Sequence, residues 1–297
     1  MSRLICSSPL RLDRRSLINL NSYHKMSGLG ETRMNLPFDV LDSIFSFLKS
    51  HPDSLVACSK AHPFFSRVAE RHLYRHITIH LGPWTSKFGY LLEPSELSKL
   101  LSETPHIVNY VRVLCIVLVD FRGRTYPTPE TSRDLEEISL VLPMLSSLEC
   151  IILNGPSHFV SWNQLPQSFT AAVEKSLHLA TLHRIHVRSL GFPLCILDNH
   201  RNINCFSLYG RPQTPDCSED SNLQLTALSF SVTRGHYLTS FLNWAKRHIF
   251  NLQSLKCDFY EGEVLGLLEI CSDTLNSLDV TLRATGELSS CIFRSYL

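Results

Sequence analysis

The sequence predicts an α/β protein in which a small unit of three helices precedes a longer array of parallel strands on one face and helices on the other. Apolar residues between residues 36 and 74 recur at helical spacing, and a short apolar pattern then returns along the rest of the chain. With 297 residues, the chain is long enough to bury a substantial core. We expect four regions: a disordered leader (1–33), the helical unit (34–80), the repeating region (81–283), and a C-terminal cap or tail (284–297).

The helical unit is punctuated by proline. Pro37 opens a first helix whose apolar residues follow three- and four-residue steps. His51-Pro52-Asp53 ends that helix, and Pro63 separates the second helix from the third. Three amphipathic helices of this length do not comfortably bury a core of their own, so we expect a partner to complete the unit.

The same residues resemble an F-box. The resemblance rests on Leu36-Pro37, Asp39-Val40-Leu41, Ile44-Phe45, Phe47-Leu48, Ser54-Leu55, Ala57-Cys58-Ser59 and Phe64-Phe65. The end of the motif departs from the commoner animal pattern and is similar to fungal F-box proteins, through Ala69, His72, Leu73, Tyr74 and Ile77. This resemblance implies docking on the Skp-type adaptor of cullin ubiquitin ligases.

An F-box would place helix faces in a groove of the adaptor. The predicted adaptor-binding residues are Leu36, Pro37, Val40, Leu41, Ile44, Leu48, Leu55, Val56 and Cys58. The remaining apolar residues are expected to hold the three helices together or to join them to the repeats: Phe45, Phe47, Phe64, Phe65, Val68 and Leu73. The alternative is that all of these positions are core.

A degenerate repeat follows, in which an apolar residue is followed by apolar residues three and five positions later. Its copies begin at Val108, Leu145, Leu182, Ile203, Leu225, Leu252 and Leu275. The middle residues of successive copies are 37, 37, 21, 22, 27 and 23 positions apart, and the later steps match the period of leucine-rich repeats. Helices are predicted between the strands at 131–142, 169–179, 237–250 and 262–271.

The junction between the two regions adds to the resemblance. Leu100-Leu101, Pro105-His106, Tyr110-Val111-Arg112, Leu142-Pro143, Leu145 and Leu148 resemble fungal F-box proteins of the leucine-rich-repeat type. The Asn that this family carries after the strand is largely missing, and Asn154 is the nearest approach.

Several further segments are predicted around the repeats. Strands are expected at 76–80 and 106–119, with a helix from Pro94 that ends at Thr104-Pro105. The segment from Arg211 to Asn222 is expected to be a surface loop. At the C-terminus, two alternatives stay open: Cys291-Ile292-Phe293 caps the last apolar face, or the chain ends early and leaves that face exposed.

The composition and net charge exclude some classes of binding partner and favour one kind of cellular compartment. A net charge of +1, with no basic face standing out, argues against nucleic acid as a partner. No apolar run reaches the eighteen or so residues of a membrane span, so we expect no membrane partner. Ten Cys residues without a CxxC pair favour a reduced cytoplasmic and/or nuclear location. The Arg- and Ser-rich leader resembles a mitochondrial presequence, although a disordered tail or a start codon placed too early also accounts for it.

Histidine-rich segments invite a catalytic interpretation that the sequence does not support. His72 and His76 have the four-residue spacing of zincin ligands but lack the accompanying Glu, so a surface or capping pair is expected. His183 to Arg188 alternates His and Arg along one strand, which is either a polar patch or ordinary solvated surface. No nucleophile elbow or phosphate-binding glycine loop follows a strand. We therefore predict no enzyme activity, no metal and no cofactor.

These patterns together predict a substrate-receptor subunit of a Skp-cullin-F-box ubiquitin ligase. Its repeats would bind an unidentified target protein through side chains that alternate out of the strands. The predicted target-binding residues are Arg112, Glu149, Arg184, His186, Lys256 and Asp279. The alternatives are an interaction protein that acts without ubiquitylation, or a hydrolase or metal enzyme assembled across the fold.

Overall fold

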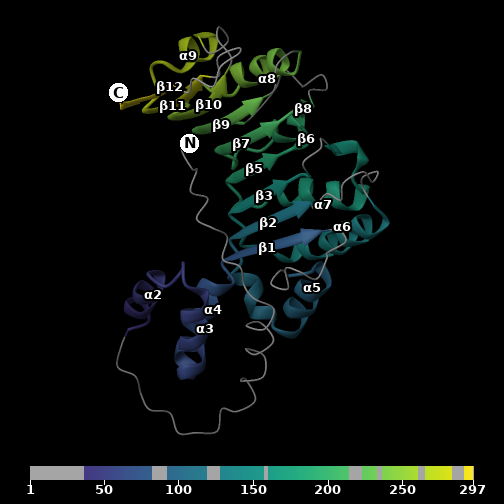
Figure 1. Cartoon of the computed structure of the whole chain (residues 1–297), viewed down its shortest axis with the longest axis vertical. Coiled ribbons are helices and arrows are strands. Elements are labelled where there is room, and N and C mark those ends of the chain that lie inside the picture. Colours follow the sequence, from purple (N-terminus) through teal and green to yellow (C-terminus); the bar gives the residue numbers. More distant parts are fainter. Residues whose placement is uncertain are drawn as a thin grey trace.

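The computed structural model describes residues 37–81, 92–118, 128–156, 160–213, 223–232, 236–259, 265–282 and 291–296. These residues form an α/β structure with eight α-helices and a nine-stranded sheet in the order β1-β2-β3-β5-β7-β9-β10-β11-β12 (Figure 1). All neighbouring strands are parallel except β12, which is antiparallel to β11. This arrangement is compatible with the solenoid-like α/β fold expected from the sequence.

The predicted three-helix unit is present as α2 (Phe38–Ser46), α3 (Pro52–Ala61) and α4 (Pro63–Leu73). Proline occupies the first position of α3 and α4, where its missing N–H costs no helical hydrogen bond. The His62 side chain caps α4 by accepting a hydrogen bond from the Phe64 backbone N–H. Helix α4 continues almost directly into β1 (His76–Leu81), which forms one edge of the sheet. The helical unit therefore ends near Tyr74, several residues earlier than the predicted boundary at residue 80.

The remaining strands follow the apolar repeats. They are β2 (Val113–Leu118), β3 (Cys150–Asn154), β5 (Arg184–Arg188), β7 (Cys205–Gly210), β9 (Ala227–Val232), β10 (Ser254–Phe259), β11 (Ser277–Leu282) and β12 (Cys291–Tyr296). The β12 strand contains Cys291, Ile292 and Phe293, which the sequence offered as an end cap, and it extends the sheet beyond β11.

Helices connect most of these strands and lie along one side of the sheet (Figure 1). They are α5 (Pro94–Glu103), α6 (Pro129–Val141), α7 (Gln167–Ser176), α8 (His236–Lys246) and α9 (Leu265–Cys271). Each overlaps a helix predicted from the sequence. The leader (1–33) and most of the predicted loop at 211–222 lie outside the described residues; Pro212–Gln213 of that loop form the short strand β8.

One predicted strand begins too early. Residues expected as strand from His106 form instead a 3-10 helix, η2 (Pro105–Asn109), and β2 starts only at Val113. Pro105 occupies the first position of η2, whose turn is closed by hydrogen bonds such as that from the Tyr110 N–H to the Ile107 carbonyl. The apolar residues Ile107 and Val111 are buried by this turn, which satisfies the same hydrophobic pattern without extending the chain.

Strand register also corrects the alignment of the first two repeats. Val111 and Leu148 begin their copies, since Val113 pairs with Cys150 and Cys150 with Arg184. The prediction placed these copies three residues earlier, at Val108 and Leu145. The register also adds a copy at β1 that the sequence did not include. The aligned first positions are Tyr74, Val111, Leu148, Leu182, Ile203, Leu225, Leu252 and Leu275.

A repeated backbone contact fixes this register. The carbonyl of the residue before each strand accepts hydrogen bonds from two consecutive N–H groups of the next copy. The Arg75 carbonyl, for example, accepts from Arg112 and Val113, both at 2.9 Å. The accepting carbonyls belong to Arg75, Arg112, Glu149, His183, Asn204, Thr226 and Gln253. Each copy is thereby tied to its neighbour before its side chains are considered.

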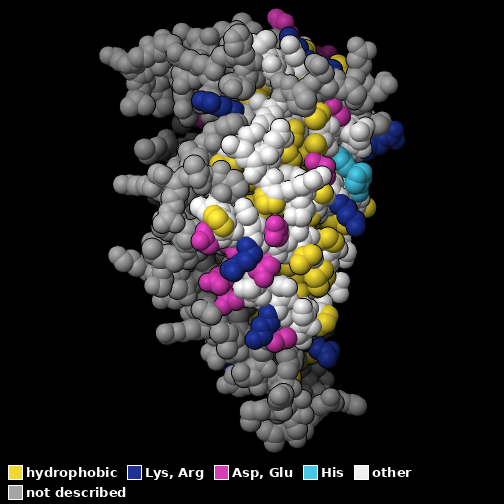
Figure 2. Space-filling view, turned by 90° about the vertical axis from the view of Figure 1, so that its right-hand side faces the viewer, with side chains coloured by type: hydrophobic (Ala, Val, Ile, Leu, Met, Phe, Trp, Pro, Cys, Tyr) yellow, Lys and Arg dark blue, Asp and Glu magenta, His cyan; other side chains and the backbone are white. Residues whose placement is uncertain are grey.

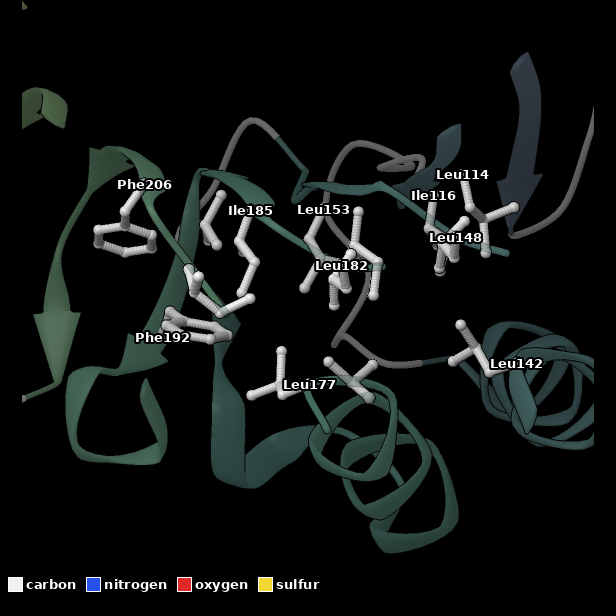
Figure 3. Close-up of a cluster of buried hydrophobic side chains, with 14 of the residues drawn as sticks. Leu114, Ile116, Leu142, Leu148, Leu153, Leu177, Leu182, Ile185, Phe192 and Phe206 are labelled. Atoms are coloured by element: carbon white, nitrogen blue, oxygen red, sulfur yellow. The ribbon is translucent and has the colours of Figure 1, made fainter. Parts of the chain in front are cut away.

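Side chains that alternate into the helix side form a continuous core. Leu153, Ile185 and Phe206 point from neighbouring strands toward Leu142 and Leu177 on the helix side (Figure 3). All five side chains are buried. Within each strand, the residues that face the helices are two positions apart. Each strand has one apolar face that only the helices and its neighbours cover, so no single copy is stable alone.

A second, short parallel sheet lies beyond the ends of three strands. It contains β4 (Val160–Ser161), β6 (Leu190–Pro193) and β8 (Pro212–Gln213), and it was not predicted. The chain turns into β6 at Ser189, whose φ is 54°. A Cβ on Gly155 would lie 2.3 Å from the Ser189 carbonyl oxygen, so this close approach of two turns requires glycine.

Polar side chains bridge neighbouring copies just before the first apolar position. The Asn202 amide nitrogen lies 3.0, 2.8 and 2.6 Å from the carbonyl oxygens of Leu177, Leu179 and Leu182. Thr181 and Thr274 occupy the equivalent place and donate to the carbonyls of Leu148 and Leu252. These residues carry no common sequence signal, because one is Asn and the others are Thr.

We predict that Asn202→Ala lowers the free energy of unfolding by about 2 kcal/mol, because carbonyl groups beneath the side chain lose their donor. Urea denaturation followed by circular dichroism measures this change. The matched control is Asn204→Ala, an exposed Asn two residues away, for which we expect a change within about 0.5 kcal/mol. Equal stability of the two variants would contradict a structural role for the Asn202 amide.

Candidate interaction surfaces

Helix α2 and the residue that follows it present large apolar side chains that stay exposed in the described part of the chain. Phe38, Val40, Ile44 and Phe47 have exposed fractions of 38%, 40%, 48% and 81%. Pro37 is also exposed and lies next to them at the start of the helix. Grouped exposed apolar side chains of this kind are typical of protein interaction sites. We call Val40, Ile44 and Phe47 the α2 apolar face; Phe38 lies on the packed side of the helix, where Arg71 and the Phe64 ring contact it.

The opposite side of α2 packs into the protein. Leu41 and Phe45 are 3% and 4% exposed, and the Phe45 ring lies 5.7 Å from that of Phe65 on α4. Leu55 and Val56 on α3 are buried in the same core. Leu41, Leu55 and Val56, which the sequence assigns to the adaptor contact, thus pack within the three helices in the described part of the chain, and their role in adaptor binding stays a prediction.

Phe47 has the opposite environment. It was expected to hold the helices together, yet it is the most exposed of the large apolar residues in the described part of the chain. Leu48 and Cys58 are partly buried against the core, and Leu36 lies outside the described residues. Of the predicted adaptor-binding residues, Pro37, Val40 and Ile44 are thus clearly accessible.

Ion pairs and rings fix α2 on α4. The Asp42 carboxylate lies 3.2 Å from His72 Nε2 and 3.7 Å from the Arg71 guanidinium. Arg71 also stands 5.3 Å above the Phe38 ring, whose edge faces Phe64. His72 lies on α4 and His76 in β1, the strand that the sequence predicted there.

A buried carboxylate joins the helical unit to the sheet region. Glu70 on α4 accepts a hydrogen bond from the Ser66 hydroxyl at 2.9 Å and lies 3.0 Å from His106 Nε2 on η2. The Glu70 side chain is 4% exposed. Burial, and secondarily the Glu70 charge, raises the pKa of the neighbouring Tyr74 hydroxyl, which keeps Tyr74 neutral at the junction. These contacts position α4 against the first repeats.

The face of the sheet away from the helices is formed by the other set of strand residues, and we call it the open face. Its middle positions, which pair in register, are Thr78, Cys115, Ile152, His186, Ser207, Ser229, Lys256 and Asp279. His186, Lys256 and Asp279 are predicted target-binding residues, and Arg184 lies on the same face two residues before His186. The structure therefore places these four on one surface.

The other two predicted target-binding residues lie at the edge of the sheet. Arg112 and Glu149 each precede a strand, and their side chains pair at 3.7 Å. Arg75 also approaches Glu149 at 3.7 Å, and Arg112 donates to the Ser147 carbonyl. The prediction that these residues alternate out of the strands is wrong for both, because the strands begin one residue later.

Charges on the open face are distributed unevenly. Lys256 and Asp279, on neighbouring strands, form a close ion pair at 2.6 Å. On β5, burial lowers the pKa of His186, and the nearby Arg184 charge lowers it further. Burial also lowers the pKa of His76 at the β1 end. His186 and His76 are therefore neutral near pH 7.

Buried polar groups also occur on the helix side. The Trp244 indole N–H donates to the Asp198 carboxylate at 2.9 Å, and His248 Nε2 lies 3.3 Å from the same oxygen. All three side chains are almost fully buried between η5 (Leu194–Leu197) and α8, where no substrate reaches them. Within the described ranges, no group of three or more His, Cys, Asp or Glu residues is arranged to hold a metal ion.

The side of the molecule in Figure 2 carries both positively and negatively charged side chains. Lys and Arg side chains stand there beside Asp and Glu, without a continuous area of one sign. Among the described residues, no helix has both the length and the apolar character needed to cross a membrane.

Comparison with known proteins adds no relative to this description. No protein-family model and no curated protein sequence matches the chain. The interaction surfaces are therefore interpreted from their geometry and chemistry.

We predict that His186 makes stability depend on pH. Its pKa in the folded protein lies below the unfolded value of 6.5, so its contribution is complete above that pH and is lost as the pH falls. Wild-type protein should therefore lose more stability than His186→Gln between pH 7.5 and 5.5 in urea denaturation. The control His51→Gln, at an exposed position before α3, should follow the wild type. Parallel pH profiles of wild type and His186→Gln would contradict the prediction.

Proposed function

We propose that this protein is a substrate receptor of a Skp-cullin-F-box ubiquitin ligase. In this proposal, α2, α3 and α4 form an F-box that binds the Skp-type adaptor, and the strands from β1 onward form degenerate leucine-rich repeats that bind a target protein. The observation that carries the proposal is the α2 apolar face, which occurs within the segment whose residues resemble the F-box.

The position of this face supports an adaptor contact. Helix α2 packs on α4 in the helical unit, below β1 in Figure 1. Leu41 and Phe45 fix the helix on α4 while the α2 apolar face remains open. An amphipathic helix presented in this way is suited to a hydrophobic groove of a partner.

The arrangement also supports a role without covalent chemistry of its own. Adaptor and target would bind at separate surfaces, and the target would be held near a ubiquitin-loaded enzyme supplied by other subunits. The direct passage from α4 into β1 and the contact between Glu70 and His106 give this bridge a defined geometry. Such rigidity favours transfer because it limits the orientations of the bound target.

We predict that Phe47→Asp and Ile44→Asp each abolish adaptor binding, because a charge would be desolvated in an apolar contact. Pull-down of the purified adaptor by the full chain measures the effect, with circular dichroism to verify folding. The matched control is Phe250→Asp, which also places a charge at an exposed Phe (65% exposed) but in the repeat region. We expect the control to bind the adaptor as the wild type does.

Unchanged adaptor binding by both folded α2 variants would contradict the F-box proposal. If the adaptor binds, reconstituted ubiquitylation of co-purified proteins distinguishes a substrate receptor from an interaction protein that acts without ubiquitylation. The receptor proposal expects ubiquitin transfer that depends on Phe47.

A further inference from the structure

Strand β5 carries a column of nitrogen-rich side chains on the open face. Arg184, His186 and Arg188 alternate with Ile185 and Val187, which are buried on the helix side. Successive members are about 7 Å apart, as strand geometry dictates. The alternating His and Arg residues seen in the sequence therefore form one surface, which we call the β5 column.

Arg184 lacks an ionic partner among the described residues. Its Nε is buried and makes no hydrogen bond there. In register it lies between Cys150 and Cys205, and burial raises the pKa of the Cys205 thiol despite the opposing charge of Arg184, so Cys205 provides no negative charge at neutral pH. A partly buried guanidinium with an unsatisfied donor is unfavourable unless an anion reaches it.

No Asp or Glu side chain near the β5 column neutralises the Arg184 charge in the described part of the open face. The outward positions of β1, β2, β3, β5, β7 and β9, as far as the structure describes them, contain no Asp or Glu. Glu149, at the edge beside Arg184, is engaged by Arg75 and Arg112. Asp279, farther along the sheet, is paired with Lys256. Arg184 and Arg188 therefore leave a local excess of positive charge.

Apolar side chains lie next to the column. Ile152 on β3 pairs in register with His186, and Val113 and Val117 are half-buried on β2, one strand farther away. Neighbouring strands are about 4.8 Å apart, so Val117 is about 10 Å from the column. A ligand crossing these strands meets an apolar area and then two fixed positive charges.

We propose that the open face over β2, β3 and β5 binds an extended acidic segment of a partner protein. One or two carboxylates of that segment pair with Arg184 and Arg188, and an apolar side chain about three residues away packs on Ile152 and Val117. About three extended residues span the two strand spacings between these subsites. The inference deepens the proposed function by giving the chemistry of the target, and it rests on that function in treating the partner as a target.

Charge and size favour a peptide over nucleic acid. Nucleic-acid binding draws on a row of phosphate contacts, whereas this area provides two permanent cations beside apolar side chains, on a chain of net charge +1. Carboxylates suit the forked donors of Arg, which bind them in pairs of parallel hydrogen bonds.

The test uses the full chain, immobilised, to select from three degenerate peptide libraries: acidic with apolar residues, basic with apolar residues, and Ser and Gly with apolar residues. We expect enrichment from the acidic library, with an apolar residue about three positions from the acid. In fluorescence anisotropy with the selected peptide, Arg184→Gln and Arg188→Gln should each weaken binding about tenfold. Arg133→Gln, the same change at an exposed position of α6, should leave affinity unaltered.

Parallel adaptor binding separates this inference from the proposed function. The β5 variants should bind the adaptor normally, while Phe47→Asp should bind the peptide normally; loss of adaptor binding alone leaves the peptide site in place. Selection of no peptide, enrichment of basic or uncharged peptides, or full affinity in both Arg variants overturns the inference. Displacement of the peptide by poly(U) RNA also overturns the inference. A further contradicting result is tighter peptide binding by the combined variant Asp216→Asn, Glu219→Gln and Asp220→Asn. Tighter binding by that variant would assign the β5 column to an acidic segment of the same chain.

Discussion

The pairing of β1 with β2 is the interaction through which the two parts of the molecule become one. Two N–H groups of the second copy bond to the Arg75 carbonyl, directly after the end of α4. Tyr74 occupies the first apolar position of the same register, so the last turn of the helical unit is also the first step of the repeat. The chain therefore has no linker at this point, and Glu70 with His106 restrains the angle between α4 and the first repeats. Loss of this pairing would separate the two surfaces that the proposed function requires to be held together.

The alternation of side chains along the repeated strands also determines which surfaces remain open. Residues that alternate toward the helices are buried by neighbouring copies, so the other set faces outward whatever its chemistry. These outward residues do not belong to the core, and on β5 they are Arg184, His186 and Arg188. Packing does not explain two arginines without an acidic partner among the described residues, because apolar or small polar residues occupy most equivalent places on the neighbouring strands. Their cost to the isolated chain is the physical reason to expect an anionic ligand.

The sequence predicted the elements well because apolar spacing alone distinguishes the helices from the strands. It placed the three initial helices and the helices between strands within a few residues of their observed bounds. It did not align the first two repeats, because Val108, Val111 and Leu114 are all apolar at three-residue intervals and therefore fit two frames. Only the pairing of Val113 with Cys150 separates these frames. The short sheet of β4, β6 and β8 was missed because strands of two to four residues leave no periodic signal.

The contact residues of α2 were harder to predict for a related reason. Apolar residues cover a broad arc of α2 beside a polar side formed by Asp39, Asp42, Ser43 and Ser46, so periodicity alone does not separate the apolar residues that pack from those that are open. The separation comes from α4, where Phe65 contacts Phe45 and Arg71 pairs with Asp42, and these contacts fix the rotation of α2. That rotation buries Leu41 and Phe45 and leaves Ile44 and Phe47 outside. A helix held on one side by a ring contact and the Arg71–Asp42 ion pair has little freedom to bury its other side within the same chain. The α2 apolar face is therefore a consequence of tertiary packing, and covering it requires a surface from outside the described residues.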